Sequence, residues 1–380
     1  MSRPFTLLIK PAGPDCNLAC RYCFYTTKKD LFAGSPLRMN DAVLECLCRS
    51  YLQLRFPVSV FAWQGGEPTL MGLDFYQKAV RLQKQFAAPG QSVHNALQTN
   101  GILLNDSMCR FLADENFLLG ISLDGPEEIH DYYRKDYAGR GTYARVMAAV
   151  DRCRKAGVEF NILVLLNDRN VESPDILFDF LTGQDFRYLQ FIPCLEADSG
   201  NPAQPAPWSI SPEQYGRFLC RLFDRWFDGW IEKLSIRTFD SILSVLSNGP
   251  PLECTFARTC SEYVVIEHNG DVFCCDFFVA PQTRLGSILD TPLEQLAAGP
   301  QKQNFNRQKR TIANSCLVCR FLDICGGGCV KDRIVLTGNP AAPSCFCKSY
   351  KMFFEHSLPR FQTLAASLAS KKKFIRPSFA

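Results

Sequence analysis

Three cysteines near the start of the chain have the spacing of a metal-binding loop. Cys16, Cys20 and Cys23 lie in the stretch CNLACRYC, separated first by three residues and then by two. Three thiolates on one tight loop can bind three irons of a four-iron cluster, which usually has four cysteine ligands. The fourth iron would then be open to another ligand, as at catalytic metal sites. A zinc loop is the alternative reading of these three residues.

Composition narrows the class of protein. The chain has 380 residues, 19 cysteines and a formal net charge of +4, from 42 basic and 38 acidic side chains. An odd cysteine count in a long chain favours metal ligation over disulfides. This small net charge does not indicate nucleic-acid binding. The run Lys371–Lys373 is typical of a solvated chain end. We see no secretory signal and no apolar run near the roughly 20 residues that cross a membrane, so we expect a cytoplasmic protein.

Apolar stretches alternate with helical patterns in the first half of the chain. The predicted strands are 7–13, 58–66, 94–101, 117–125, 158–166 and 186–193. The predicted helices are 40–55, 74–87, 105–115, 142–156, 172–182 and 211–232. Candidate N-caps are Asn40, Asp74 and Ser211. This alternation predicts an α/β fold with a parallel sheet, in a partial (β/α)6 TIM-like barrel whose functional residues lie at the carboxyl ends of the strands.

Glycine and polar residues gather at these predicted strand ends. Gly65 and Gly66 let the backbone approach a ligand closely, Glu67 can accept from a ligand ammonium, and Pro68 fixes the turn. Alone, this segment could equally be an ordinary strand–helix turn. Other strand ends carry Gln64, Thr99, Asn100, Ser122 and Asp124.

A second cysteine-rich region follows a candidate boundary at about residues 233–250. Its cysteines are Cys254, Cys260, Cys274, Cys275, Cys316, Cys319, Cys325, Cys329, Cys345 and Cys347. The turn at 268–271 between two β-rich runs predicts a hairpin. Eight of these thiols would be enough for two fully ligated clusters, and Gly326–Gly328 permits a tight wrap around one of them. Zinc sites are the structural alternative.

The motifs taken together resemble one family. The stretches LIKPAG, CNLACRYCFY, QGGEPTL, LQTNG, SLDGP, IHDYYRKD, EFNIL and LQFIPCLE look like those of the anaerobic sulfatase-maturating enzymes. These are radical S-adenosylmethionine (SAM) enzymes with a cysteine-rich C-terminal SPASM domain. The resemblance implies a radical SAM partial barrel over 1–235, a small SPASM domain with auxiliary clusters over 236–350, and a C-terminal helix and tail over 351–380.

The same resemblance implies cofactors and site residues. The cofactors would be SAM and three [4Fe–4S] clusters, one that binds SAM through Cys16, Cys20 and Cys23 and two that are auxiliary. Implied SAM contacts are Tyr22 beside the adenine, Gly66 and Glu67 at the methionine end, Ser122 and Arg134 at the ribose or carboxylate, and Leu195 at the adenine. A guanidinium suits a carboxylate, although Arg134 could instead pair with Asp131 or Asp136. Tyr25 and Gln64 would lie near the substrate.

The auxiliary ligands are also paired only by resemblance. One cluster would take Cys254, Cys260, Cys275 and Cys329, and the other would take Cys316, Cys319, Cys325 and Cys347. Cys275 is chosen because it precedes Asp276, and Cys347 because it precedes KSYKMFF. Cys274 and Cys345 remain possible replacements for these neighbours. The remaining cysteines on apolar or helical stretches are expected to be small core residues; they are Cys46, Cys48, Cys109, Cys153, Cys194 and Cys220.

The implied activity is oxidation of a Cys or Ser in a sulfatase precursor to Cα-formylglycine. An electron from the N-terminal cluster would cleave SAM to methionine and a 5′-deoxyadenosyl radical, which removes a Cβ hydrogen from the peptide. Asp276 would take the thiol or hydroxyl proton as general base, and an auxiliary cluster would accept the second electron. Hydrolysis of a thioaldehyde gives formylglycine. Expected partners are an unfolded or nascent sulfatase segment and an electron donor such as flavodoxin or ferredoxin, with no nucleic acid and no membrane.

Two other function classes stay open from the sequence. One is another SPASM-type peptide maturase, which forms a thioether or epimerises a residue of an unknown peptide. The other is a non-catalytic electron-transfer or zinc scaffold. Asp276 and the QGGEPTL context favour formylglycine formation, and the open three-cysteine site argues against a scaffold.

Overall fold

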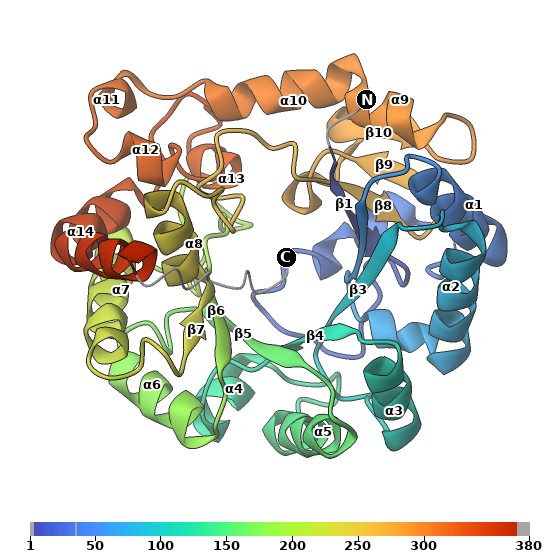
Figure 1. Ribbon diagram of the computed structural model, residues 1–380, viewed down its shortest axis with the longest axis horizontal. Helices are drawn as coiled ribbons and strands as arrows, with labels where there is room; N and C mark the ends of the chain where they lie inside the picture. Colours follow the sequence, from blue (N-terminus) through green and yellow to red (C-terminus); the bar gives the residue numbers. More distant parts are fainter. Residues whose placement is uncertain (1–3, 35, 371–380) are drawn as a thin grey trace. The chain divides into compact units, whose positions relative to one another are not determined.

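The computed structural model describes residues 4–34 and 36–370 (Figure 1). The chain divides into two compact units. The first unit consists of Met1–Leu123, His130–Phe160 and Cys260–Asn306. The second consists of Asp124–Ile129, Asn161–Thr259 and Arg307–Ala380. The Lys371–Lys373 run lies outside the described residues, as does the part after residue 370 of the C-terminal helix and tail expected over 351–380. The domain boundaries after residues 235 and 350 stay predictions.

The first unit is built on a mostly parallel sheet. Its strands are β1 (Thr6–Lys10), β2 (Val58–Trp63), β3 (Ser92–Thr99), β4 (Leu118–Ser122), β8 (Tyr263–Glu267), β9 (Asp271–Phe273) and β10 (Arg284–Ser287). They lie in the order β10-β9-β8-β1-β2-β3-β4, and β1 to β4 pair in parallel. The predicted hairpin at 268–271 is confirmed, because it joins β8 to antiparallel β9. The parallel pairing of β8 with β1 was not predicted.

Helices follow the strands of the first unit as the alternation predicted. They are α1 (Asp41–Leu52), α2 (Leu73–Phe86), α3 (Asp106–Asp114), α5 (Tyr143–Ala156) and α9 (Leu293–Ala298), with the short 3-10 helices η1 (Thr26–Phe32), η2 (Pro68–Met71), η3 (Asp276–Phe278) and η4 (Pro281–Thr283). The helix α4 (Glu127–Tyr133) begins in the second unit and α10 (Pro300–Arg310) ends there. Figure 1 shows α1 and α2 along the outer side of β1 to β3.

Two predicted helix starts have different outcomes in this unit. The Asn40 side chain accepts from the Val43 backbone N–H at 2.9 Å, so that cap is confirmed. The prediction for Asp74 is wrong, because α2 begins at Leu73 and its N-cap is Gly72. Gly72 has a φ of +75° that favours glycine, and the turn before the helix therefore uses backbone conformation where the sequence suggested a carboxylate cap.

The second unit contains the remaining strands and most C-terminal helices. Its parallel strands are β5 (Phe160–Leu166), β6 (Tyr188–Pro193) and β7 (Ser235–Ile236). Its helices are α6 (Pro174–Gly183), α7 (Pro212–Phe227), α8 (Arg237–Leu246), α11 (Asn314–Leu317), α12 (Leu322–Cys325), α13 (Val330–Ile334) and α14 (Cys347–Ser370). Ser211 caps α7 as predicted, and it does so in a capping box with Gln214 that was not predicted. The segment 233–250, suggested as a boundary, contains helix α8.

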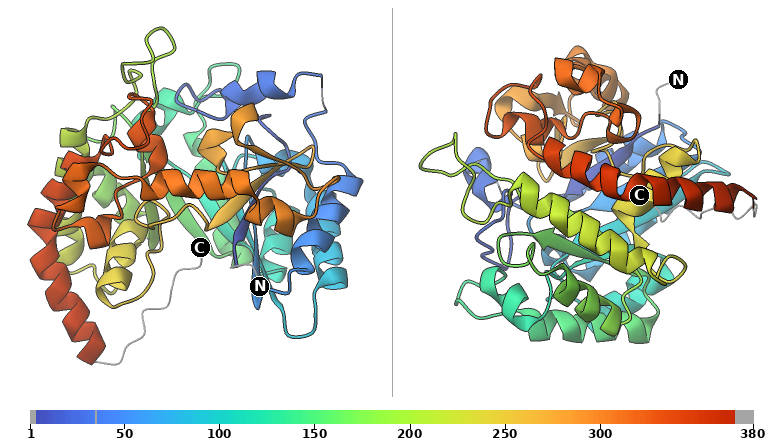
Figure 2. Two further views of the ribbon diagram at one scale, coloured as in Figure 1. Left: turned by 90° about the horizontal axis from the view of Figure 1, so that it is seen from above. Right: turned by 90° about the vertical axis from the view of Figure 1, so that its left-hand side faces the viewer.

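The long helix α14 packs along α7, and Figure 2 shows the two side by side. Their contact is aromatic, with Phe223 of α7 against Phe361 of α14 at 4.6 Å between ring centroids. Asp224 of α7 adds 2.8 Å contacts to His356 and Arg360. Since Cys347 is the first residue of α14, this packing fixes the place of that thiol. No helix within 4–34 and 36–370 is both long and apolar enough to cross a membrane.

Candidate metal centres and cofactor site

The N-terminal cysteine loop follows β1 in the first unit. Cys16, Cys20 and Cys23 are all partly buried, and the Leu18 backbone N–H points at Cys16 Sγ over 3.4 Å. Burial raises the pKa of the Cys16 thiol to about 12. Metal ligation deprotonates cysteine, so a metal bound here would hold Cys16 as a thiolate. The loop chemistry fits an iron–sulfur cluster that three thiolates hold.

The glycine-rich strand end binds the start of this loop through its backbone. The Gly66 N–H donates to the Gly13 carbonyl at 2.9 Å, and the Glu67 N–H donates to the Asp15 carbonyl at 2.8 Å. A Cβ atom on Gly66 would lie 1.9 Å from the Asp15 oxygen. Only glycine permits this approach, so Gly66 sets the distance between the strand end and the cysteine loop.

The other side of the cysteine loop touches the segment after α4. The Ala19 N–H donates to the Lys135 carbonyl at 2.8 Å. The Arg134 guanidinium lies over the Tyr22 ring at 5.5 Å, and the Tyr133 ring meets the same tyrosine edge-on at 5.5 Å. Two residues predicted to contact SAM, Tyr22 and Arg134, are therefore neighbours in the first unit.

The carboxylates suggested as alternative partners of Arg134 have other contacts. Asp131 accepts from two backbone N–H groups at the start of α5. Asp136 lies 3.0 Å from both Arg140 and Arg145, and these hydrogen bonds and charges lower its pKa although burial opposes them. Both aspartates thus shape the turn after α4 and the beginning of α5.

Glu67 is almost fully buried, and its carboxylate is surrounded by donors from the chain. It accepts from the Thr69 N–H at 2.9 Å, the Thr99 hydroxyl at 2.7 Å and the Asn100 N–H at 2.8 Å. Burial raises its pKa, and these hydrogen bonds oppose that rise. Glu67 therefore joins the ends of β2 and β3, and its predicted contact with the methionine ammonium stays a prediction.

The other predicted contacts occupy strand ends. Ser122 is the last residue of β4 and is 9% exposed, while Gln64 directly follows β2 and donates its N–H to the Ile9 carbonyl at 2.8 Å. Leu195, in the second unit, is buried two residues after β6, and its carbonyl accepts from the Lys331 ammonium. The roles of Ser122, Gln64 and Leu195 stay predictions.

Asp276 lies close to the cysteine loop within the first unit. Its Oδ1 accepts from the Tyr263 hydroxyl at 3.2 Å and from the Phe277 N–H at 3.1 Å. The rings of Phe24 and Phe277, which directly follow Cys23 and Asp276, pack with centroids 4.9 Å apart. This contact joins the predicted general base to the loop of the predicted radical-generating cluster.

Two residues of this neighbourhood, Glu267 and Tyr263, were not predicted from the sequence. The Tyr25 hydroxyl donates to both carboxylate oxygens of Glu267, at 2.6 and 2.8 Å, and both residues are buried. Burial, followed by the Glu267 charge, raises the pKa of Tyr25 well above its usual value. Tyr263, also missed, contacts Cys275 Sγ at 3.2 Å. The hairpin pattern offered a signal, because Tyr263 and Glu267 fall on the same face of one strand.

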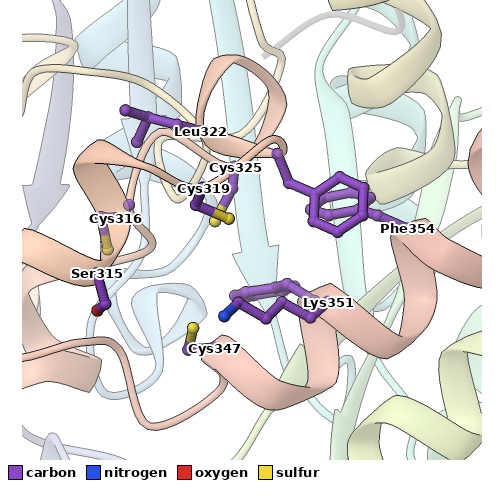
Figure 3. A pocket seen from close by; sticks show the side chains of 11 residues that line it. Ser315, Cys316, Cys319, Leu322, Cys325, Cys347, Lys351 and Phe354 are labelled. Atoms are coloured by element: carbon purple, nitrogen blue, oxygen red, sulfur yellow. The ribbon is translucent and has the colours of Figure 1, made fainter.

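Four C-terminal cysteines surround a hollow in the second unit. Cys316, Cys319, Cys325 and Cys347 line it with Phe321, Tyr350 and Phe354 (Figure 3). Its cavity volume is about 30 Å³, and the hollow is partly open to solvent. Cys345 is not among its lining residues; its N–H donates to the Asp332 carbonyl at 2.9 Å. Four thiols around one hollow with largely apolar walls have the donor set of a fully ligated cluster.

Three consecutive glycines follow Cys325, and the middle one, Gly327, lines this hollow. Gly326, Gly327 and Gly328 have φ values of +60°, +83° and +72°. A Cβ on Gly326 would meet the Phe256 carbonyl oxygen at 2.3 Å. The tight wrap expected from the sequence therefore depends on the left-handed backbone that glycine adopts without strain.

The four cysteines assigned to the other auxiliary cluster are divided between the units. In the first unit, Cys274 and Cys275 are buried with Phe305, and Cys260 packs against them. In the second unit, Cys254 is exposed and Cys329 directly precedes α13. Both candidates at 274 and 275 thus remain beside Cys260.

The cysteines expected in the core differ in burial. Cys48, Cys109, Cys153 and Cys194 are buried as predicted, whereas Cys46 and Cys220 are only partly buried. The Sγ atoms of Cys109 and Cys153 lie 3.8 Å apart between α3 and α5. Cys46 Sγ instead reaches the Ile288 carbonyl at 3.1 Å.

The chain is similar to known proteins over nearly its whole length. The radical SAM superfamily matches residues 11–181, and the SPASM iron–sulfur cluster-binding domain matches residues 254–320. The chain is 36% identical to the serine-type anaerobic sulfatase-maturating enzyme of Bacteroides thetaiotaomicron, over 98% of this chain and 94% of that protein. It is also 36% identical to the cysteine-type enzyme of Clostridium perfringens, over 96% and 99% of the two chains.

The fold comparison agrees. The solved structure described as native anSMEcpe with bound AdoMet superposes with a TM-score of 0.89 at 35% identity, over 96% of this chain and 100% of that one. A structure of that protein with AdoMet and the Cp18Cys peptide has the same TM-score of 0.89. The predicted α/β fold of a radical SAM partial barrel with a SPASM domain is confirmed by this match, and these domains use SAM and [4Fe–4S] clusters. The chain belongs to the anaerobic sulfatase-maturating enzymes, a family of radical SAM oxidoreductases.

Proposed function

We propose that this enzyme oxidises a Cys or Ser side chain in a peptide segment of a sulfatase precursor to Cα-formylglycine. The observation that carries the proposal is the packing of Phe24 on Phe277, with ring centroids 4.9 Å apart. These rings directly follow Cys23 and Asp276, so the proposed radical source and the proposed base would share one neighbourhood. Relatives of both the serine and the cysteine type support a peptide substrate without deciding between the two residues.

The cysteine loop and its flanking residues would bind the cofactor. Cys16, Cys20 and Cys23 would hold the cluster, and Tyr22 with Arg134 would form one wall of the SAM site. When bound, SAM and this cluster supply a one-electron cleavage that yields a radical able to remove a hydrogen atom from carbon. The Gly66 contact with Asp15 supports the proposal, because it holds the loop against the strand ends.

Asp276 would be the general base. Loss of a Cβ hydrogen atom, one proton and one electron converts CH2–SH to a thioaldehyde, or CH2–OH to an aldehyde. Asp276 would accept the proton from sulfur or oxygen, and water would convert the thioaldehyde to the aldehyde with release of hydrogen sulfide. The hydrogen bonds from Tyr263 and the Phe277 N–H fix the carboxylate for this role.

The electron would pass to the auxiliary clusters. We propose Cys316, Cys319, Cys325 and Cys347 for one cluster, because all four line the same hollow while Cys345 does not. For the other cluster we retain the set named by resemblance; it is Cys254, Cys260, Cys275 and Cys329. A cytoplasmic location and a flavodoxin or ferredoxin as donor remain predictions.

The test is anaerobic incubation of the reduced, cluster-loaded enzyme with SAM and a peptide that contains a Cys-x-Pro-x-Arg or Ser-x-Pro-x-Arg segment. We expect mass spectrometry to find an aldehyde that a hydrazide reagent captures, together with 5′-deoxyadenosine. An internal thioether, or deuterium incorporation at Cα without a new aldehyde, would assign the enzyme to another maturase class.

A further inference from the structure

Lys302 on α10 is a buried cation that neither the family resemblance nor the proposed mechanism uses. It is only 2% exposed. Its Nζ donates to the carbonyls of Cys260 and Tyr263 at 2.8 Å and of Cys274 at 2.9 Å. An ammonium has three N–H donors whereas a neutral amine has two, and none of these acceptors can donate in return. The geometry is therefore that of a charged lysine.

The surroundings of this charge are apolar. Cys274, Cys275 and Phe305 form a buried cluster, with Cys260 and Tyr263 packed against it, and the Phe305 ring centroid lies 5.8 Å from Nζ. A charge acts strongly on its neighbours where water is excluded. Burial of a cation is costly unless an anionic partner is near, and a cluster with four thiolate ligands is such an anion.

We propose that Lys302 is a positioning residue that raises the reduction potential of the auxiliary cluster bound through Cys260 and Cys275. This inference rests on the proposed function, in which that cluster takes one electron from the substrate radical. Reduction adds a negative charge to the cluster, and a fixed ammonium beside its ligands stabilises the added charge. Net charge and burial are the quantities by which a protein sets such potentials.

A second lysine repeats the arrangement in the second unit. Lys309 Nζ donates to the Thr255 carbonyl at 2.9 Å and to the Gly328 carbonyl. Thr255 follows Cys254 and Gly328 precedes Cys329, the other two ligands proposed for the same cluster. This repetition favours an electrostatic role over a single packing accident.

The experiment is a redox titration of the cluster-loaded holoenzyme, followed by electron paramagnetic resonance. The signal that Cys260→Ala removes identifies the cluster. Lys302→Met and Lys302→Gln remove the charge, Lys302→Arg keeps it, and Arg310→Gln removes an exposed charge from the same helix as a matched control. We expect a shift to lower potential in the Met and Gln variants, a value near the parent in the Arg variant, and little change in the control, because solvent screens Arg310.

A cluster potential that stays unchanged in loaded Lys302→Gln overturns the inference. If the Met variant loses iron, the Gln and Arg variants decide, since the Gln amide keeps two N–H donors and the Arg guanidinium five for the three carbonyls. A merely structural role would lower iron content without a shift in potential. As a second readout, we expect less aldehyde per 5′-deoxyadenosine in Lys302→Gln. Should the parent form no aldehyde, the proposed function fails, while the measured potentials still judge Lys302.

Discussion

The N-terminal cysteine loop and the C-terminal cysteine hollow differ in their number of thiols and in their surroundings. The loop offers three cysteines, beside a buried carboxylate at Glu67 and a guanidinium at Arg134. The hollow offers four, with walls that include the aromatic rings of Phe321, Tyr350 and Phe354. Three ligands with polar neighbours suit a cluster that binds and cleaves a cofactor. Four ligands with apolar neighbours suit a cluster that only exchanges electrons.

The largest expected effect comes from removing one of the three cysteines of the N-terminal loop. Cys16→Ala should abolish 5′-deoxyadenosine formation, because the chemistry depends on the cluster of that loop. Cys347→Ala should lose about four irons per chain yet still cleave SAM. Iron analysis and chromatography of the nucleoside products measure both effects. Cys345→Ala is the matched control, and SAM cleavage by Cys16→Ala at the parent rate would remove the distinction between the two sets.

The base should have the next largest effect. Asp276→Asn should slow peptide oxidation by roughly 10²–10⁴-fold, the usual contribution of a general base, while SAM binding stays intact. Single-turnover kinetics with peptide, alongside equilibrium binding of SAM, would separate the two steps. An aldehyde yield equal to that of the parent would exclude Asp276 from proton transfer.

A substitution at Gly66 tests how strictly the N-terminal cysteine loop is held against the strand end. Gly66→Ala would place a Cβ 1.9 Å from the Asp15 carbonyl oxygen, so the strand end and the cysteine loop must separate. We expect a loss of about 1–3 kcal/mol in unfolding free energy and weaker SAM binding. Anaerobic urea denaturation and a SAM titration measure these. Gly183→Ala is the control, because nothing lies within 4 Å of its Cβ; equal effects in both variants would show that Gly66 has no special place.

A smaller, pH-dependent effect is expected at Asp240 in the second unit. Burial raises the pKa of Asp240 on α8 to about 6, above the roughly 3.9 of an unfolded aspartate. The folded state therefore binds this proton more tightly, and the stability that Asp240 contributes is lost as the pH rises through about 6. Asp240→Asn should exceed the parent in unfolding free energy by roughly 1–3 kcal/mol at pH 8, with little difference near pH 4. Denaturation at both pH values checks this, and a gain that is independent of pH would contradict it.

Local patterns predicted much of the fold. They also proposed the two cysteine sets, whose ligand roles stay predictions. Strand–helix alternation gave the order of the elements, and the Ser211 cap and the hairpin were both readable from short segments. The position of that hairpin in the sheet could not be predicted from local sequence, because β8 pairs with β1 across some 250 intervening residues. Asp74 misled because a carboxylate near a helix start resembles a cap, while Gly72 makes the actual turn.

The residues that the sequence did not disclose depend on contacts distant in the chain. Glu267 accepts a hydrogen bond from Tyr25, which is 242 residues away in the chain. Lys302 looks like any lysine of a polar helix until its three carbonyl acceptors are seen. Patterns of residue type therefore proposed the ligands, whereas the side chains that contact their surroundings, such as Tyr263 and Lys302, became visible only in the fold.

Transfer of deuterium from the peptide tests the central claim most directly. The substrate peptide would carry its target Cys or Ser deuterated either at Cβ or at Cα, and 5′-deoxyadenosine would be analysed by mass spectrometry after one turnover. The account predicts deuterium in 5′-deoxyadenosine from the Cβ-labelled peptide alone, together with a deuterated aldehyde in the product. Deuterium that arrives from Cα instead would contradict formylglycine formation by this enzyme.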